Sequence, residues 1–214
     1  MQTNSKFFGV HDFMDMEQRY RAAFFNSLGG FKSLNMVGTV DAQGKTNLSI
    51  VNSVFHIGAN PPYIGMIIRP DKVERHTLEN MLETEWYTLN HVHAGIYKQA
   101  HQASARYDKS VSEFDACRLT PYFSNECIAP YVKESHIRIG LKVAEIKPLE
   151  INGTVLVIGS VKEVTIPAEA LSADGFVDIE MAGSLAGSGL DSYHSTKRIA
   201  RLSYAKPGVE PTEI

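Results

Sequence analysis

The chain has 214 residues, of which 43% are hydrophobic and 21% charged. This composition excludes an intrinsically disordered protein, which needs low hydrophobicity and high net charge. The net charge of −3 argues against a nucleic-acid binder that neutralises phosphates, and against an anionic membrane as partner. The longest apolar stretches, 63–68 and 155–158, are far shorter than the roughly 20 residues of a membrane helix. We expect one globular domain over residues 1–214.

The N-terminus and the cysteines bear on the cellular compartment. The first residues lack the long apolar core of a secretion signal, which predicts a cytoplasmic protein. Cys117 and Cys127 are the only cysteines, and they lie too far apart for the closely spaced pairs of a structural zinc site. They could form one disulfide, but without an export signal we expect reduced thiols.

The first third of the chain predicts one helix and then strands. Apolar residues recur at three- and four-residue spacing over 13–28, and Gly29-Gly30 follows, so we expect an amphipathic helix that extends the domain. A hairpin turn is expected at 41–45, and Asn60-Pro61-Pro62 should lie between strands because proline cannot donate to a ladder. The strands expected here are 33–40, 46–57 and 63–69.

The rest of the chain mixes short helices with long strands. Asn152-Gly153 is a strong signal for a hairpin. The expected helices are 77–83, 94–103 and 111–118, and the expected strands are 86–92, 136–143 and 154–166. Antiparallel hairpins interrupted by short helices, without βαβ alternation, predict a mainly β fold, a β-barrel with peripheral helices.

A cationic segment joins the third strand to a helix. Residues 69–77 carry Arg69, Lys72 and Arg75, followed by His76 and Thr77. A helix start offers unpaired N–H groups to an anion, and arginine recognises phosphate in a two-pronged way. The segment predicts a pocket for one phosphate group. The alternative is a solvated basic loop in which Thr77 caps the helix.

The predicted strand 46–57 is unusually polar. It carries Asn47, Ser49, Asn52 and Ser53 among apolar residues, although asparagine is disfavoured inside strands. Buried amides and hydroxyls need partners, and a planar polar ligand such as a flavin ring would supply them. Alternatively, these side chains bond to neighbouring backbone or face water.

Three other motifs do not predict a site. Tyr193 and Lys197 match the Tyr-x-x-x-Lys pair of short-chain dehydrogenases, but the glycine-rich turn and βαβ units of that fold are missing. His91 and His93 lack a convincing third or fourth metal ligand. Residues 183–189 lack the Gly-Lys-Ser/Thr ending of a phosphate-binding loop. We expect no metal site and no nucleophilic hydrolase.

Several short motifs occur between residues 30 and 205, and their order along the chain is informative. They are Gly38–Leu48 ending in Asn47-Leu48, Asn60-Pro61-Pro62, Arg69, His76-Thr77-Leu78 with Asn80, Trp86–Asn90, Ser104-Ala105, Val111–Phe114 and Leu190–Tyr193. In this order they resemble the flavin reductase-like family, whose fold is an FMN-binding split β-barrel. The sequence departs from the family at Asn52-Ser53-Val54, at His91-Val92-His93 and at 187–190, which leaves the substrate open.

The resemblance implies FMN bound at a homodimer interface. It implies hydride transfer from NADH or NADPH to bound or free flavin, with small-molecule substrates and no catalytic residue beyond the flavin itself. The residues it implies for binding are Arg69, Arg75, His76 and Thr77 around the phosphate, Asn47, Leu48, Ser49, Val51, Asn52 and Ser53 along the ring and ribityl chain, Ser104 and Ala105 on one side, and Tyr193 from the tail. One alternative is a non-catalytic, flavoredoxin-like FMN protein that exchanges electrons with a protein partner. Another is a ligand- or metal-binding barrel without flavin.

Overall fold

The structure is a computed structural model that describes residues 4–69 and 76–214. Its helices over these ranges are α1 (Val10–Asp15), α2 (Gln18–Leu28), α3 (His76–Thr84), α4 (Tyr97–Gln102), α5 (Glu113–Cys117) and a 3-10 turn at Ala168–Ala170. Its strands are β1 (Lys32–Ser33), β2 (Asn35–Val40), β3 (Thr46–Val51), β4 (Val54–Ala59), β5 (Pro62–Ile68), β6 (Trp86–His91), β7 (Pro121–Tyr122), β8 (Tyr131–Val132), β9 (Arg138–Leu149), β10 (Thr154–Thr165), β11 (Ala186–Ser188) and β12 (Ser192–His194).

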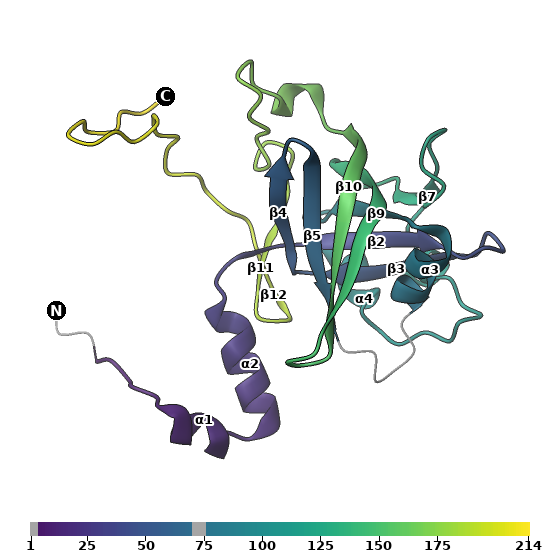
Figure 1. The fold of residues 1–214 in the computed structure, drawn as a ribbon, viewed down its shortest axis with the longest axis horizontal. Helices are drawn as coiled ribbons and strands as arrows, with labels where there is room; N and C mark the ends of the chain where they lie inside the picture. Colours follow the sequence, from purple (N-terminus) through teal and green to yellow (C-terminus); the bar gives the residue numbers. More distant parts are fainter. Residues whose placement is uncertain (1–3, 70–75) are drawn as a thin grey trace.

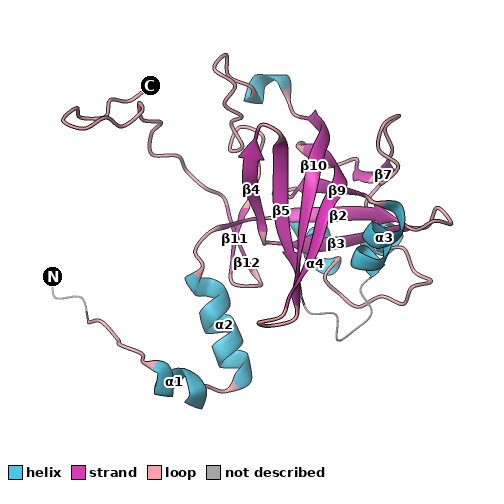
Figure 2. Ribbon diagram, in the orientation of Figure 1, coloured by secondary structure: helices cyan, strands magenta, loops and turns pink. Residues whose placement is uncertain are grey.

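Seven antiparallel strands form the body, in the order β3-β2-β6-β9-β10-β5-β4. In Figure 1, β4, β5 and β10 run across β2 and β3 rather than alongside them. The long β9–β10 hairpin belongs to both halves, because β9 pairs with β6 through 138–142 while β10 pairs with β5 through 155–160. Two register shifts in this hairpin are bulges of the kind that bend strands. Strands dominate Figure 2 and helices lie at the periphery, so the predicted mainly β barrel is confirmed.

The two predicted hairpin turns are present. Asp41 Oδ1 accepts from the N–H groups of Gln43 and Lys45 at 2.9 and 2.8 Å, and Gly44 has a φ of 85°, which glycine adopts without strain. Gly153 has a φ of 71° in the β9–β10 turn. Both turns therefore form where short-range turn chemistry placed them.

Several predicted boundaries were wrong. The strand expected over 46–57 is two strands, β3 and β4, separated at Asn52 and Ser53. These side chains bond to backbone carbonyls of other segments, Gly189 at 3.0 Å and Ile67 at 2.7 Å. The helix expected over 13–28 is α1 and α2, because Met16 is extended and Glu17 caps α2 by accepting from two N–H groups. Pro62 begins β5 instead of lying between strands, a position that proline tolerates.

Two apolar clusters support the body. One fills the barrel between the strands and α3; its buried members include Val37, Met66, Met81, Tyr87, Leu141 and Val157. The other packs α4 and α5 against β3; its members include Met36, Leu48, Ala100, Phe114 and Cys117. Both cysteines are free and buried, and burial raises the pKa of the Cys127 thiol to about 11. Among the described residues, no helix is both long and apolar enough to cross a membrane.

The two chain ends leave the barrel. Helices α1 and α2 project from it, and the C-terminal segment beyond β12 extends away from it on the same side of Figure 1. Between them, β1 pairs with β11, and β11 with β12, in a small separate sheet. This sheet positions the 186–194 hairpin at the edge of the cleft described next.

Candidate functional site

A cavity of about 810 Å³ opens between β3, β5, the start of α3, the 103–109 loop and the β11–β12 hairpin. Its lining includes every predicted binding residue that the structure describes: Asn47, Leu48, Ser49, Val51, Asn52, Ser53, Arg69, His76, Thr77, Ser104, Ala105 and Tyr193. Arg75 and Lys72 lie outside the described residues. Segments far apart in the sequence therefore meet around one space, whose size is typical of a small-molecule site.

One end of the cavity is a buried hydrogen-bond network. Thr77, the second residue of α3, donates to Ser49 Oγ at 3.0 Å and accepts from Asn47 Nδ2 at 3.0 Å. The Thr39 hydroxyl on β2 accepts from the side-chain amides of Asn47 and Asn80 at 3.2 and 3.1 Å. The network ties α3 to β2 and β3, and it fixes the hydroxyls that face the cavity.

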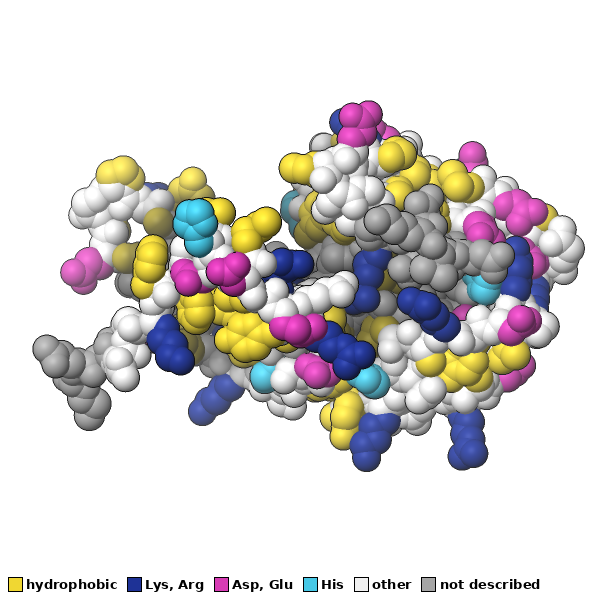
Figure 3. Space-filling view, turned by 90° about the horizontal axis from the view of Figure 1, so that it is seen from below, with side chains coloured by type: hydrophobic (Ala, Val, Ile, Leu, Met, Phe, Trp, Pro, Cys, Tyr) yellow, Lys and Arg dark blue, Asp and Glu magenta, His cyan; other side chains and the backbone are white. Residues whose placement is uncertain are grey.

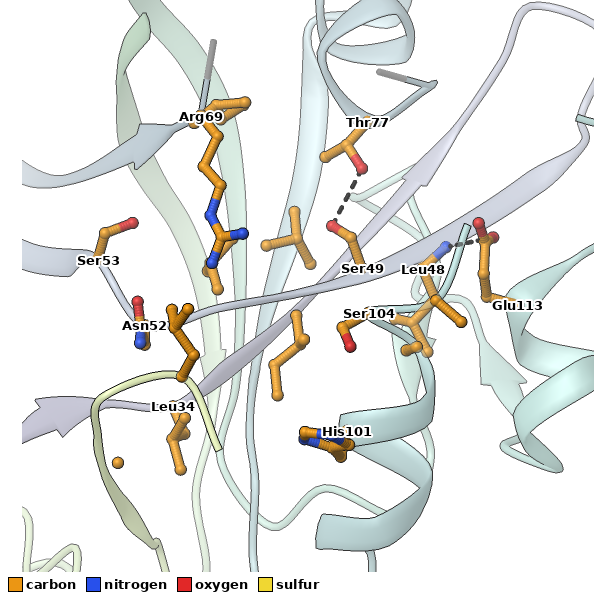
Figure 4. A pocket seen from close by; sticks show the side chains of 18 of the residues that line it. Leu34, Leu48, Ser49, Asn52, Ser53, Arg69, Thr77, His101, Ser104 and Glu113 are labelled. Carbon is orange, nitrogen blue, oxygen red and sulfur yellow. Dashed lines mark hydrogen bonds between the residues drawn. The ribbon is translucent and has the colours of Figure 1, made fainter. Parts of the chain in front are cut away.

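Arg69 follows β5 and supplies positive charge beside this network. In Figure 4 its guanidinium reaches into the cavity, with Thr77 and Ser49 on the other side of the space and Asn52 and Ser53 nearby. The strand thus directs a planar cation toward a pair of hydroxyls. Such a set of N–H and O–H donors suits a phosphate oxyanion.

The polar residues of 46–53 have partners within the protein. Asn47 and Ser49 belong to the network, while Asn52 and Ser53 bond to backbone carbonyls. Protein groups therefore supply partners for these side chains, so their polarity by itself does not demonstrate the flavin ring that the sequence suggested as a partner. All four residues nevertheless line the cavity.

Strand β3 is an edge of the seven-stranded sheet, and its backbone faces the cavity region. The N–H of Leu48 points away from β2 and donates to Glu113 Oε2 at 3.1 Å. Because strand backbone groups alternate in direction, the N–H of Ile50 faces the same way. Glu113 is only 7% exposed, and it positions the strand. Glu113 belongs to the Val111–Phe114 motif, but the sequence assigned it no role at the cavity.

The opposite wall is formed by α4 and the β11–β12 hairpin. Tyr193 Oη and His101 Nδ1 are 2.9 Å apart, and the Tyr97 ring lies 5.5 Å from that of Tyr193. Burial, with a smaller contribution from Asp191, raises the pKa of Tyr193. The cavity also takes in Asn26 of α2 and Lys32 of β1. Sequence reasoning missed these two and His101, because only the fold brings them to Tyr193.

The cavity has more basic than acidic neighbours. Its lining includes the cations Lys32, Arg69, Arg106 and Lys109 and the acids Asp108, Glu113 and Asp191. Figure 3 shows Lys and Arg side chains around the hollow in this face. Lys109 also pairs with Glu79 at 3.1 Å. The balance favours an anionic ligand.

His91, the last residue of β6, and His93, two residues further on, take part in local packing. His91 Nδ1 lies 2.8 Å from Ser184 Oγ, and burial lowers the pKa of His91 to about 4. The His93 and His136 rings stack at 4.1 Å, and His93 Nε2 donates to the Glu134 carbonyl at 3.0 Å. Across the described part of the chain, no group of three or more metal-binding side chains gathers.

A mainly β barrel with a polar, cationic cleft at its edge is the architecture of a split-barrel flavoprotein. Residues 28–180 match the family model described as flavin reductase like domain, and the chain belongs to this family. The predicted family and split-barrel fold are thereby confirmed.

Solved structures agree with this assignment. A split-barrel protein of Shewanella frigidimarina NCIMB 400, provisionally described as a flavin reductase, is 51% identical, with a TM-score of 0.91 over 94% of this chain and all of that one. Nitrilotriacetate monooxygenase component B from Bacillus cereus is 18% identical, with a TM-score of 0.81 over 94% of this chain and all of that one; this likeness concerns the fold alone. A sequence relative in Aquifex aeolicus, an uncharacterized protein, is 22% identical over 55% of this chain and 61% of its own length.

Proposed function

We propose that the chain binds FMN in this cleft and works as an NAD(P)H-dependent flavin oxidoreductase. The supporting observation is that Arg69 and Thr77, from different elements, meet the edge strand β3 around one cavity. Family membership supports a flavin. A single cluster of cation and hydroxyls supports FMN, with its one phosphate.

The donor set fits this ligand. Arg69, His76, Thr77 and Ser49 would hold the phosphate, because they present N–H and O–H groups at one end of the cavity. Asn47, Leu48, Val51, Asn52 and Ser53 would line the ribityl chain and ring, with Ser104, Ala105 and Tyr193 on the remaining walls. Leu34, Ile50 and Met66 add apolar surface in the same cavity, as a planar ring needs.

The chemistry divides between cofactor and protein. FMN held in this cleft would supply the acceptor for a hydride from NADH or NADPH, with free flavin or another small molecule as the final acceptor. The protein binds and orients this group. The edge-strand N–H of Ile50 and the hydroxyls beside it stabilise negative charge on a bound ligand. Glu113 keeps the strand in place by accepting from Leu48. The proposed hydride transfer needs no acid–base pair, because the cofactor carries the redox chemistry.

Three further predictions belong to this proposal. The family resemblance supports a homodimer that encloses the ligand. Location in the cytoplasm and a single domain over residues 1–214 also remain predictions. The choice between NADH and NADPH is left open, because no acidic side chain can be assigned to a ribose.

The test is the visible spectrum of the purified chain, loaded with FMN if it is isolated colourless, before and after NADH or NADPH is added without air. We expect a flavin spectrum that bleaches within seconds to minutes. A flavin that dithionite reduces but neither nucleotide does would support the flavoredoxin-like alternative, electron exchange with a protein partner. Failure to bind FMN at all would contradict both.

A further inference from the structure

The segment 182–185 leads from the barrel into the β11–β12 hairpin, which is one wall of the cleft. Residues 187–193 of this hairpin line the cavity. At the base of the hairpin, the Leu185 N–H donates to the Val92 carbonyl at 2.9 Å, which holds the segment beside the end of β6. A change that releases the segment therefore also loosens a wall of the cleft.

Three histidines hold this segment to the barrel. His91 Nδ1 lies 2.8 Å from Ser184 Oγ, and His136 Nδ1 donates to the Ala182 carbonyl at 2.8 Å. His93 forms a backbone bridge with Ser184, and its ring stacks on that of His136 with centroids 4.1 Å apart and planes 8° apart. His91, His93 and His136 are called the histidine cluster below. The sequence departs from its family at His91 and His93, so family membership does not predict this cluster.

The hydrogen bonds of His93 require the neutral ring. Its Nδ1 accepts from the Gly95 N–H at 3.1 Å, so this nitrogen carries no proton, and its Nε2 donates to the Glu134 carbonyl at 3.0 Å. A proton on Nδ1 would remove the bond to Gly95, because a charged imidazole has two donors and no acceptor. It would also place a positive charge against the stacked His136 ring. The geometry of the cluster therefore suits neutral rings.

Burial favours the same neutral forms. It lowers the pKa of His91 to about 4. Burial also lowers the pKa of His93, and the nearby His136 adds to this, whereas the carbonyl and carboxylate of Glu134 act in the other direction. A histidine in an opened, solvated segment titrates near its ordinary value of about 6.5. Opening of the segment is therefore accompanied by proton uptake below this pH.

The neighbouring elements offer little to compensate a charge on the cluster. Residues 181–190 contain no titratable side chain, and neither do residues 94–96 or strand β2. The charged side chains of the other neighbouring segments have partners of their own: Glu134 accepts from the Thr120 N–H, Arg138 lies over the Tyr122 ring, Asp178 and Glu180 bind Arg198, and Lys32 donates to the Asn26 carbonyl. A proton taken up by the cluster is therefore better accommodated after the segment has opened.

We infer that the histidine cluster makes this wall of the cleft sensitive to pH, so that acid releases segment 182–185 and speeds the passage of ligand into and out of the cleft. The inference rests on the proposed function for the identity of the ligand, FMN, and deepens it by naming a regulation of the same site. The sign follows from linkage. The closed segment binds fewer protons than the open one, so the equilibrium constant for opening rises as the pH falls.

Amide hydrogen exchange of the full chain at pH 7.5 and pH 5 tests the opening without any ligand. The measured quantity is the protection factor, the ratio of the intrinsic to the observed exchange rate. For the Leu185 N–H it should fall about 10-fold between the two pH values, because each histidine freed by opening contributes up to about 30-fold. This exchange should be nearly independent of dilute urea, since a local opening exposes little surface.

The triple variant His91→Gln/His93→Gln/His136→Asn removes the titrating rings and keeps side-chain amides in their place. Its Leu185 protection factor should change less than about 3-fold between pH 7.5 and pH 5. His56→Gln is the matched control at an exposed histidine of β4 outside the cavity, and it should keep the full wild-type change. Circular dichroism shows whether each variant is folded. If the triple variant is not, His91→Gln alone should remove part of the change.

The rate of FMN release measures the consequence for the cleft. Recovery of flavin fluorescence after dilution follows the release, which should be about 10-fold faster at pH 5 than at pH 7.5 in the wild type. The triple variant should show a smaller acceleration. A phosphate monoester titrates near pH 6, and His76, His101 and His194 lie in or beside the cleft. These groups are the same in both proteins, so the difference between the proteins reports on the cluster.

The outcomes separate the parts of the inference. It is overturned by a Leu185 protection factor that does not change with pH, by a triple variant with the full wild-type change, or by exchange that accelerates with urea as steeply as global unfolding. Release of FMN that accelerates equally in wild type and triple variant overturns the regulation of the cleft. An opening that depends on pH and on the cluster, in a chain with no affinity for FMN, supports the pH-sensitive wall and contradicts the proposed function.

Discussion

The two ends of the cleft are built differently. Around Thr77, the side chains of β2, β3 and α3 bond to one another in a buried network. At the other end, the β11–β12 hairpin faces α4 through one side-chain hydrogen bond, between Tyr193 and His101, which is exposed to solvent. A wall with many side-chain hydrogen bonds is pre-organised, while a wall with fewer of them adapts at lower cost. Under the proposed function, this difference favours the first end as the site of the FMN phosphate and the second end as the site of exchanging molecules.

The largest expected effect is at the network end. Arg69→Ala with Thr77→Ala should weaken FMN binding about 1,000-fold, because each lost bond to a charged phosphate costs about 1.5–3 kcal/mol. Quenching of flavin fluorescence on titration measures the affinity. Lys147→Ala, at an exposed lysine of β9 outside the cavity, is the control. If the wild type, the Arg69→Ala/Thr77→Ala variant and the control bound FMN with equal affinity, the phosphate would not bind at this end.

Acid should destabilise the fold through His91, on β6 outside the cavity. Burial holds the pKa of His91 at about 4 rather than 6.5, so the unfolded chain takes up a proton more readily than the folded chain. Stability is therefore complete above pH 6.5 and declines by about 2–3 kcal/mol as the pH falls toward 4. Urea unfolding at several pH values measures this change.

His91→Gln is the matched variant for the pH series, because it keeps a polar group near Ser184 but does not titrate. Its stability should change less between pH 6.5 and 4 than that of the wild type. Identical slopes for the two proteins would show that His91 does not carry the pH dependence.

The strand that both ends share depends on Glu113. Glu113→Ala leaves the buried Leu48 N–H unpaired and should lower the free energy of unfolding by about 1–3 kcal/mol. Glu113→Gln keeps an acceptor and should lose less. Denaturant titration separates the two variants, and an equal loss for both would mean that the carboxylate charge matters more than the hydrogen bond.

The smallest effect is expected at Tyr193. Tyr193→Phe removes only the bond to His101 and should cost about 0.5–1.5 kcal/mol of stability, with FMN affinity nearly unchanged. Thermal unfolding and flavin titration measure the two quantities. If Tyr193→Phe lost as much FMN affinity as the Arg69→Ala/Thr77→Ala variant, both ends of the cleft would contribute equally to FMN binding, and the proposed difference between them would be wrong.

Much of the fold follows from the sequence. The turns at 41–45 and 152–153 rest on short-range chemistry, and the order of the motifs predicted both the family and the residues that line the cleft. The break at Asn52 could not be foreseen, since its partner, Gly189, is 137 residues away along the chain. For the same reason, the sequence did not predict that Glu113 and His101 line the cavity. Tertiary packing decides whether a polar strand residue faces a ligand or a backbone carbonyl. The periodicity of hydrophobic residues in the sequence carries no information on this choice.

A crystal structure of the chain grown with FMN tests the central claim most directly. The account predicts that the phosphate lies against Arg69 and the Thr77 hydroxyl, with the flavin ring along the free edge of β3. Density for the phosphate at the Tyr193 end, or for the whole molecule outside the cleft, would contradict it.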